Sequence, residues 1–89
     1  MATVTLNWLI PESGGPVESY NVYRVAQEET SASVIVDPAN KINSTPLPST
    51  PRTYVDDSVS RGDGAYSYTV TAVNTGGESV GATPTTQTL

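Results

Sequence analysis

The stretch Ala65-Tyr66-Ser67-Tyr68-Thr69-Val70-Thr71-Ala72-Val73-Asn74 decides the fold class of this chain. From Tyr66 to Ala72 every second residue is aromatic or apolar, and the residues between them are Ser and Thr. A period of two is typical of a β-strand that packs one face against a core. The residues that follow, Thr75-Gly76-Gly77, suit the backbone conformations of a hairpin turn. The sequence therefore predicts a half-buried strand that ends in a hairpin.

Further short strands are predicted on either side of this stretch. Val4, Leu6 and Trp8 alternate with polar residues, and residues 20–25, 53–56 and 78–88 also have strand character, the last interrupted by Pro84. Turn residues separate these segments, as at Pro11–Pro16. This spacing favours an all-β fold, an antiparallel sandwich formed by residues 1–89 as a single domain.

The segment between residues 26 and 52 is less regular. Val34–Val36 is a short apolar run, which we expect to form an added strand, and Lys41–Asn43 is a candidate for another. Pro46, Pro48 and Pro51 cannot donate backbone hydrogen bonds, so their segment is expected at a sheet edge. Helical periodicity does not persist over three turns anywhere, so essentially no helix is expected.

Composition excludes several classes of function. The 89 residues contain no cysteine and no histidine, which removes the commonest metal ligands and the commonest general base. The net charge of -5 disfavours binding to a nucleic acid backbone. Apolar runs are too short to cross a membrane. We therefore expect no enzyme activity, no metal, no cofactor, and neither nucleic acid nor membrane as a partner.

Taken together, the motifs resemble a fibronectin type III domain. The resemblance lies in Val4-x-Leu6-x-Trp8, Tyr20-x-Val22-x-Arg24, Tyr54-x-Asp56 and Tyr66-x-Tyr68-x-Val70-x-Ala72-x-Asn74. It implies an immunoglobulin-like β-sandwich of the type that accompanies bacterial extracellular enzymes, secreted or at the cell surface. It also implies that Tyr66 bonds to backbone just upstream and that Val59 plugs the core nearby. The implied core consists of Trp8, Tyr20, Val22, Tyr54, Tyr66, Tyr68, Val70 and Ala72.

The chain departs from this family at its start. The family has a first strand before the strand that corresponds to Val4–Trp8, and only Met1, Ala2 and Thr3 precede it here. The first strand is therefore expected to be short or missing. The strand at Val4–Trp8, which the family calls strand B, would then be an open edge, through which the chain could associate with itself or with another protein.

Three groups of residues are candidates for a binding site. Arg61-Gly62-Asp63 matches an integrin-binding tripeptide, but it precedes the Tyr66 strand rather than following it, so a turn is the favoured interpretation. Asp56 and Asp57 are adjacent, and neighbours on a strand point to opposite faces. Tyr23 has the parity opposite to Tyr20 and Val22, which predicts an exposed ring and a possible surface contact.

The resemblance implies a non-catalytic accessory or spacer module of a larger extracellular bacterial protein, such as a polysaccharide-degrading enzyme. Its partners would then be the neighbouring domains of the same polypeptide. The alternative is a recognition module that binds a carbohydrate or a protein through its loops or its open strand B edge. Because fold alone does not determine function, both remain hypotheses.

Overall fold

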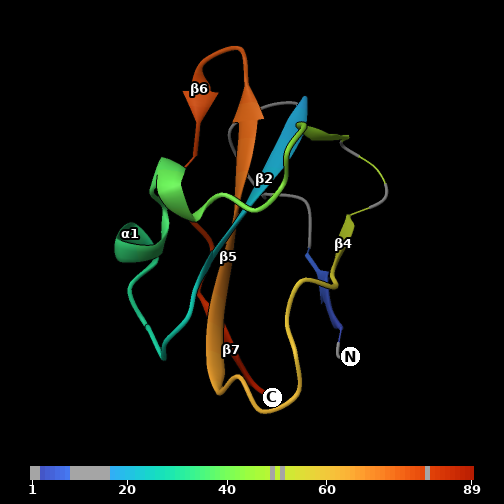
Figure 1. Ribbon diagram of the computed structural model, residues 1–89. Helices are drawn as coiled ribbons and strands as arrows, with labels where there is room; N and C mark the ends of the chain where they lie inside the picture. Colours follow the sequence, from blue (N-terminus) through green and yellow to red (C-terminus); the bar gives the residue numbers. More distant parts are fainter. Residues whose placement is uncertain (1–2, 9–16, 49, 51, 80) are drawn as a thin grey trace.

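Strand β5 (Ala65–Asn74) is the centre of the fold (Figure 1). It pairs antiparallel with β2 (Ser19–Val25) along one edge, and with β6 (Gly77–Glu78) and β7 (Thr85–Thr88) along the other. The edge strand β3 (Leu47–Pro48) completes this five-stranded sheet beside β2. The strand predicted from the alternating sequence is therefore present, and Leu47–Pro48 of the proline-rich segment lies at an edge as expected, whereas Pro51 lies outside the described residues.

A second, two-stranded antiparallel sheet is formed by β1 (Val4–Asn7) and β4 (Thr53–Asp56). This computed structural model describes residues 3–8, 17–48, 50, 52–79 and 81–89. The turn expected at Pro11–Pro16 lies outside those residues. In the described part the fold is mostly β with antiparallel sheets, as the sequence predicted.

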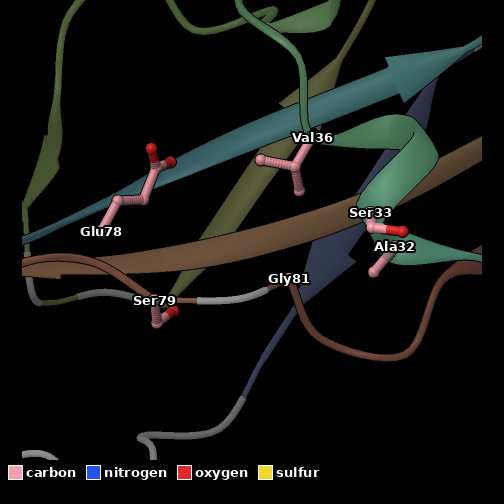
Figure 2. Close-up of a pocket in the computed structure, with 6 residues that line it drawn as sticks. All are labelled: Ala32, Ser33, Val36, Glu78, Ser79 and Gly81. Carbon is pink, nitrogen blue, oxygen red and sulfur yellow. The ribbon is translucent and has the colours of Figure 1, made fainter.

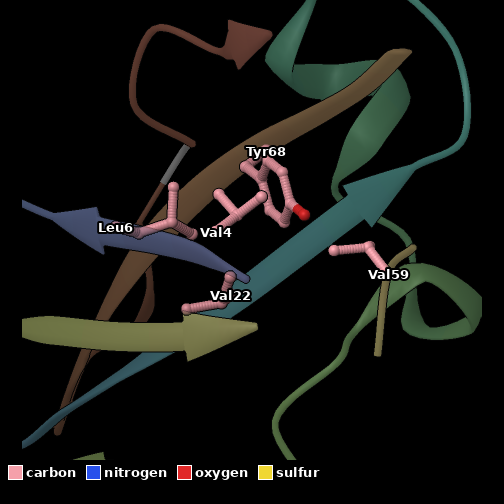
Figure 3. Close-up of a cluster of buried hydrophobic side chains, with 5 residues drawn as sticks. All are labelled: Val4, Leu6, Val22, Val59 and Tyr68. Atoms are coloured by element: carbon pink, nitrogen blue, oxygen red, sulfur yellow. The ribbon is translucent and has the colours of Figure 1, made fainter. Parts of the chain in front are cut away.

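The hydrophobic core lies between the two sheets. Figure 3 shows Val4 and Leu6 of β1 facing Val22 of β2 and Tyr68 of β5, with Val59 beside them. All five are buried, so this cluster contributes hydrophobic stabilisation that holds the two sheets together. Of the other expected core residues, Tyr20 is buried, Ala72 is half-buried, and Trp8, Tyr54, Tyr66 and Val70 are partly buried against the cluster.

The strand expected at Val34–Val36 is wrong, and the expectation of essentially no helix holds except for two short helical turns. Residues Ala32–Ile35 form helix α1, and Pro38–Asn40 form the 3-10 helix η1. Asp37 caps η1 by accepting a hydrogen bond from the Ala39 N–H. Residues 41–43 contribute a single bridge, Lys41 to Tyr23, rather than a strand. A one-turn helix is too short to produce a helical period in the sequence. Burial of Ile35 in the helix outweighs the strand propensity of Val34 and Ile35.

Helix α1 covers the face of β5 that the sequence assigned to solvent. Ser67, Thr69 and Thr71 are buried on this face, each at most 2% exposed. Tyr23, which was expected to be an exposed contact, is 4% exposed because it lies on the same covered face of β2. The period of two in β5 was predicted correctly. It separates an apolar face from a hydroxyl-bearing face, and both faces are buried.

We expect Ile35→Ala to lower the free energy of unfolding by about 2–4 kcal/mol, because Ile35 is the fully buried residue of α1. The matched variant Val34→Ala, in the same helical turn, should change it by less than about 0.5 kcal/mol, since Val34 is 51% exposed. Urea unfolding of both variants measures the difference. Equal effects would show that α1 does not pack on the sheet.

Candidate functional site

A groove of about 370 Å³ lies between α1 and the segment that follows β6 (Figure 2). Ala32, Ser33 and Val36 line one side, and Glu78, Ser79 and Gly81 line the other. Gly81 permits the close approach of the two sides. A Cβ atom at Gly81 would lie 2.7 Å from the Thr69 hydroxyl and 3.0 Å from the Ala32 side chain, both too close. Because Gly81 has no side chain, this segment can pack closely against α1 and β5.

Glu78 places its carboxylate at one end of this groove. In the hairpin of β5 and β6, Glu78 pairs with Val73. Paired residues share a face of the sheet, so Glu78 lies on the face of β5 that carries Thr71. Its Oε2 atom accepts a hydrogen bond from the Tyr23 hydroxyl at 2.5 Å and one from the Asn21 amide at 3.2 Å. The Thr71 hydroxyl donates a third, short hydrogen bond to the same oxygen. The carboxylate is thus oriented by three neutral donors.

These contacts change the ionisation of both partners. Partial burial opposes the charge of Glu78, but hydrogen bonds from Thr71, Tyr23 and Asn21 outweigh it and hold the pKa of Glu78 below its usual value. Burial, together with the bond to the Glu78 carboxylate, raises the pKa of Tyr23 to about 12. Glu78 is therefore a charged acceptor at neutral pH, and Tyr23 remains a neutral donor.

A second carboxylate, Asp56, connects the two sheets. It lies at the end of β4 and is 3% exposed. Its Oδ2 atom accepts hydrogen bonds from Arg24 of β2 and from the Tyr68 hydroxyl of β5, each at 2.7 Å. Ser58 donates to its Oδ1 atom from both its backbone N–H and its hydroxyl. The Arg24 guanidinium also lies 5.0 Å from the centre of the Tyr66 ring, within cation–π range.

Asp56 is a structural group rather than a poised acid. Burial alone would raise its pKa, but hydrogen bonds from Ser58, Tyr68 and Arg24 lower the pKa to about 2. Burial and the Asp56 carboxylate in turn raise the pKa of Tyr68. Asp57, the adjacent carboxylate, is exposed and does not join this cluster. The two aspartates therefore do not form a facing pair.

The Arg61-Gly62-Asp63 tripeptide forms a turn before β5. Gly62 has a φ of 94°, which favours glycine, and Asp63 accepts hydrogen bonds from the Ser60 N–H and the Tyr66 hydroxyl, both at 2.8 Å. These two bonds lower the pKa of Asp63. The Tyr66 hydroxyl was expected to bond to backbone upstream, and it bonds to the Asp63 carboxylate instead. The tripeptide thus closes the turn.

Sequence reasoning missed Glu78, since it treated the hydroxyl face of β5 as solvent-exposed. The hairpin signal and the strand parity together would have placed Glu78 beside Thr71. In the described residues, no cluster of His, Cys, Asp and Glu could hold a metal ion. No helix within that same part of the chain is long and apolar enough to cross a membrane. No protein-family model matches the chain, and no curated protein matches it.

Asp56 should make stability depend on pH. Because its folded pKa lies below its ordinary value, its contribution of about 2 kcal/mol is present above roughly pH 5 and is lost as the pH falls toward about 2. Asp56→Asn should cost about 2–4 kcal/mol at pH 7, since Arg24 loses its counterion. Urea unfolding across this pH range measures both.

The matched control is Asp57→Asn, which should change stability by less than about 0.5 kcal/mol at pH 7. The difference between wild type and Asp56→Asn should shrink as the pH falls, whereas the Asp57→Asn difference should stay small throughout. A gap that is constant from pH 7 to about pH 2.5 would contradict the assignment to Asp56.

Proposed function

We propose that the chain is a β-sandwich of the fibronectin type III type and acts as a non-catalytic accessory module in a larger extracellular bacterial protein. The strand order β3-β2-β5-β6 in one sheet and β1-β4 in the other supports this architecture. A polysaccharide-degrading enzyme remains the parent that the resemblance favours. The partners would be neighbouring domains.

The observation that carries the proposal is the use of the ionisable groups. Asp56 and Arg24 join the two sheets, Asp63 closes a turn, and Glu78 is held by three neutral donors. Catalytic groups need an acid, base or nucleophile poised beside a substrate. These side chains instead rigidify a small body that measures 40 × 24 × 22 Å. A rigid body of this size suits a module that positions its neighbours.

The positions of the first and last described strands bear on how the module would position its neighbouring domains. In Figure 1, β1 begins toward the same end of the molecule at which β7 ends. Neighbouring domains joined before β1 and after β7 would therefore extend from the same end of the module. A strand added beside β1 in the antiparallel sense would return the chain to the opposite end, and would turn the module into an in-line spacer.

A fusion with a fluorescent domain at each end tests this proposal. The chain should hold the two domains at a fixed, short separation, so single-molecule energy transfer should give a narrow, high-efficiency peak. A Gly/Ser linker of the same length should give a broad distribution at lower efficiency, since it behaves as a random coil. A distribution as broad as that of the linker would exclude a positioning role.

Recognition through the edge of β1 is the second candidate. In the part of the chain that is described, β1 pairs with β4 alone. The Trp8 N–H donates a hydrogen bond to the Arg52 carbonyl, on the side of β4. Backbone groups of successive residues point to alternate sides of a strand, so those of Thr5 and Asn7 point to the open edge. A hollow of about 130 Å³ lies beside Leu6 and Trp8. An open edge next to a hollow favours the addition of a strand.

Thr5→Pro tests this candidate. Proline removes the outward N–H of Thr5 while it leaves the pairing with β4 intact, so it should abolish any self-association through this edge. We expect light scattering to show a concentration-dependent dimer for the wild type and a monomer for Thr5→Pro. A wild type that is monomeric up to millimolar concentration, or a dimer that survives Thr5→Pro, would contradict association through β1.

A further inference from the structure

The turn before β5 contains a dipeptide whose backbone can rearrange without a catalyst. Asp63 is the one aspartate of the sequence that precedes a glycine, Gly64. Glycine has no side chain to hinder an approach to its backbone nitrogen, so an aspartate followed by glycine is especially prone to close a five-membered imide ring. The other three aspartates precede an aspartate, a serine and a proline, and proline has no N–H to lose.

The dipeptide lies at the surface, in the turn beside the C-terminus in Figure 1. Asp63 is exposed, and Gly64 has a φ of 95°. A Cβ atom built on Gly64 would meet no atom of the described residues within 4 Å. The backbone here can therefore change its path locally while the core between the sheets stays packed.

Two hydrogen bonds hold the Asp63 side chain in place. Its Oδ2 atom accepts one from the Ser60 N–H and one from the Tyr66 hydroxyl, both at 2.8 Å. The Asp63 N–H also donates to the Ser60 carbonyl at 3.1 Å. A carboxylate that is held as an acceptor of two donors stays ionised, and an ionised carboxylate is a poor electrophile. The folded turn therefore opposes ring closure.

We propose that Asp63 and Gly64 form a site of spontaneous isoaspartate formation, which the folded turn restrains through the Tyr66 hydroxyl. The proposal goes beyond the positioning role described above, since it assigns a covalent modification to the chain. It also does not depend on that role.

The reaction needs only water. The Gly64 nitrogen forms a bond to Cγ of the protonated Asp63 side chain, and the carboxyl hydroxyl leaves with the amide hydrogen as one molecule of water. The product is a cyclic succinimide. Water then adds to either of its carbonyl carbons: addition at Cγ restores aspartate, and addition at the backbone carbonyl carbon gives isoaspartate. The mass of the final product equals that of the original chain.

Asn43 is the other candidate for this chemistry, because an asparagine followed by serine, here Ser44, also closes an imide ring. Asn43 is 4% exposed. Its Oδ1 atom accepts a hydrogen bond from the Val22 N–H at 2.8 Å, and its Nδ2 atom donates to Asn21 Oδ1 at 3.0 Å and to the Thr45 carbonyl at 2.9 Å. The fold therefore encloses Asn43, whereas Asp63 depends on exposed hydrogen bonds.

The modification would loosen the last strand. The Gly64 carbonyl accepts a hydrogen bond from the Leu89 N–H at 3.0 Å, and the next residue, Ala65, pairs with Thr88 at the end of β7. An isoaspartyl link adds one atom to the backbone directly before these contacts. It also moves the carboxylate from its position beside Tyr66. The turn thus couples the age of the chain to the attachment of β7.

The test incubates the chain at physiological temperature and pH, either folded or unfolded in guanidinium chloride. A protein isoaspartyl methyltransferase quantifies isoaspartate, and mass spectrometry locates it in the tryptic peptide 62–89, in which Asp63 is the one aspartate. We expect the unfolded chain to form isoaspartate at Asp63 about tenfold faster than the folded chain, since two hydrogen bonds are released. No isoaspartate at Asp63 in the unfolded chain, or equal rates in the two states, would overturn the proposal.

Tyr66→Phe removes the hydroxyl but keeps the ring that Arg24 contacts. In the folded chain it should raise the rate about fivefold. The matched Tyr54→Phe, whose lost hydroxyl bonds to the Ile42 carbonyl, should leave the rate unchanged. Equal rates for folded Tyr66→Phe and wild type would contradict the role of Tyr66. If Tyr66→Phe does not fold, the comparison of folded and unfolded wild type decides alone.

Asp63→Glu supplies the chemical control. A glutamate would have to close a six-membered ring, which forms far more slowly, so the isoaspartate signal should disappear. A signal that persists in Asp63→Glu would place the modification at another residue and overturn the assignment. The energy-transfer experiment is independent of this result, so the two proposals fail separately.

Discussion

The carboxylate of Asp56 is the constraint on which the two-sheet arrangement depends. It belongs to β4, and it accepts from Arg24 of β2 and Tyr68 of β5, which belong to the other sheet. The two-stranded sheet is small, so Val4 and Leu6 supply limited apolar area on its side of the core. A buried carboxylate must have its partners, or it costs several kcal/mol. The requirement therefore fixes how the sheets align.

Strand β5 is buried on both faces, but by different chemistry. One face presents Tyr68 and Val70 to the apolar core. The other presents Ser67 and Thr69, whose hydroxyls donate to the backbone carbonyls of Gln27 and Ala82 at 2.8 and 2.6 Å. Hydroxyl groups can be buried without penalty when covering segments supply acceptors. Those segments are irregular: Gln27 lies between β2 and α1, and Ala82 lies between β6 and β7, so the loops complete the core.

This explains what the sequence could and could not predict. Periodicity was sufficient for β1, β2, β4 and β5, since one apolar face per strand produces a period of two. It could not reveal α1, because Val34 and Ile35 have strand propensity and one helical turn leaves no period. It also misplaced Tyr23, because a face of Ser and Thr looks solvent-exposed unless the covering segment is known. Glu78 was overlooked for the same reason, although hairpin register places it beside Thr71.

The two central carboxylates, Asp56 and Glu78, are held in different ways. Asp56 and Glu78 each accept a hydrogen bond from a tyrosine hydroxyl, and the pKa of each is lowered. Asp56 is enclosed and paired with Arg24, so its charge is satisfied internally. Glu78 is exposed, and its Oε2 atom accepts hydrogen bonds from three neutral donors. The enclosed carboxylate therefore joins the two sheets, whereas Glu78 joins the hairpin of β5 and β6 to β2 through Asn21 and Tyr23.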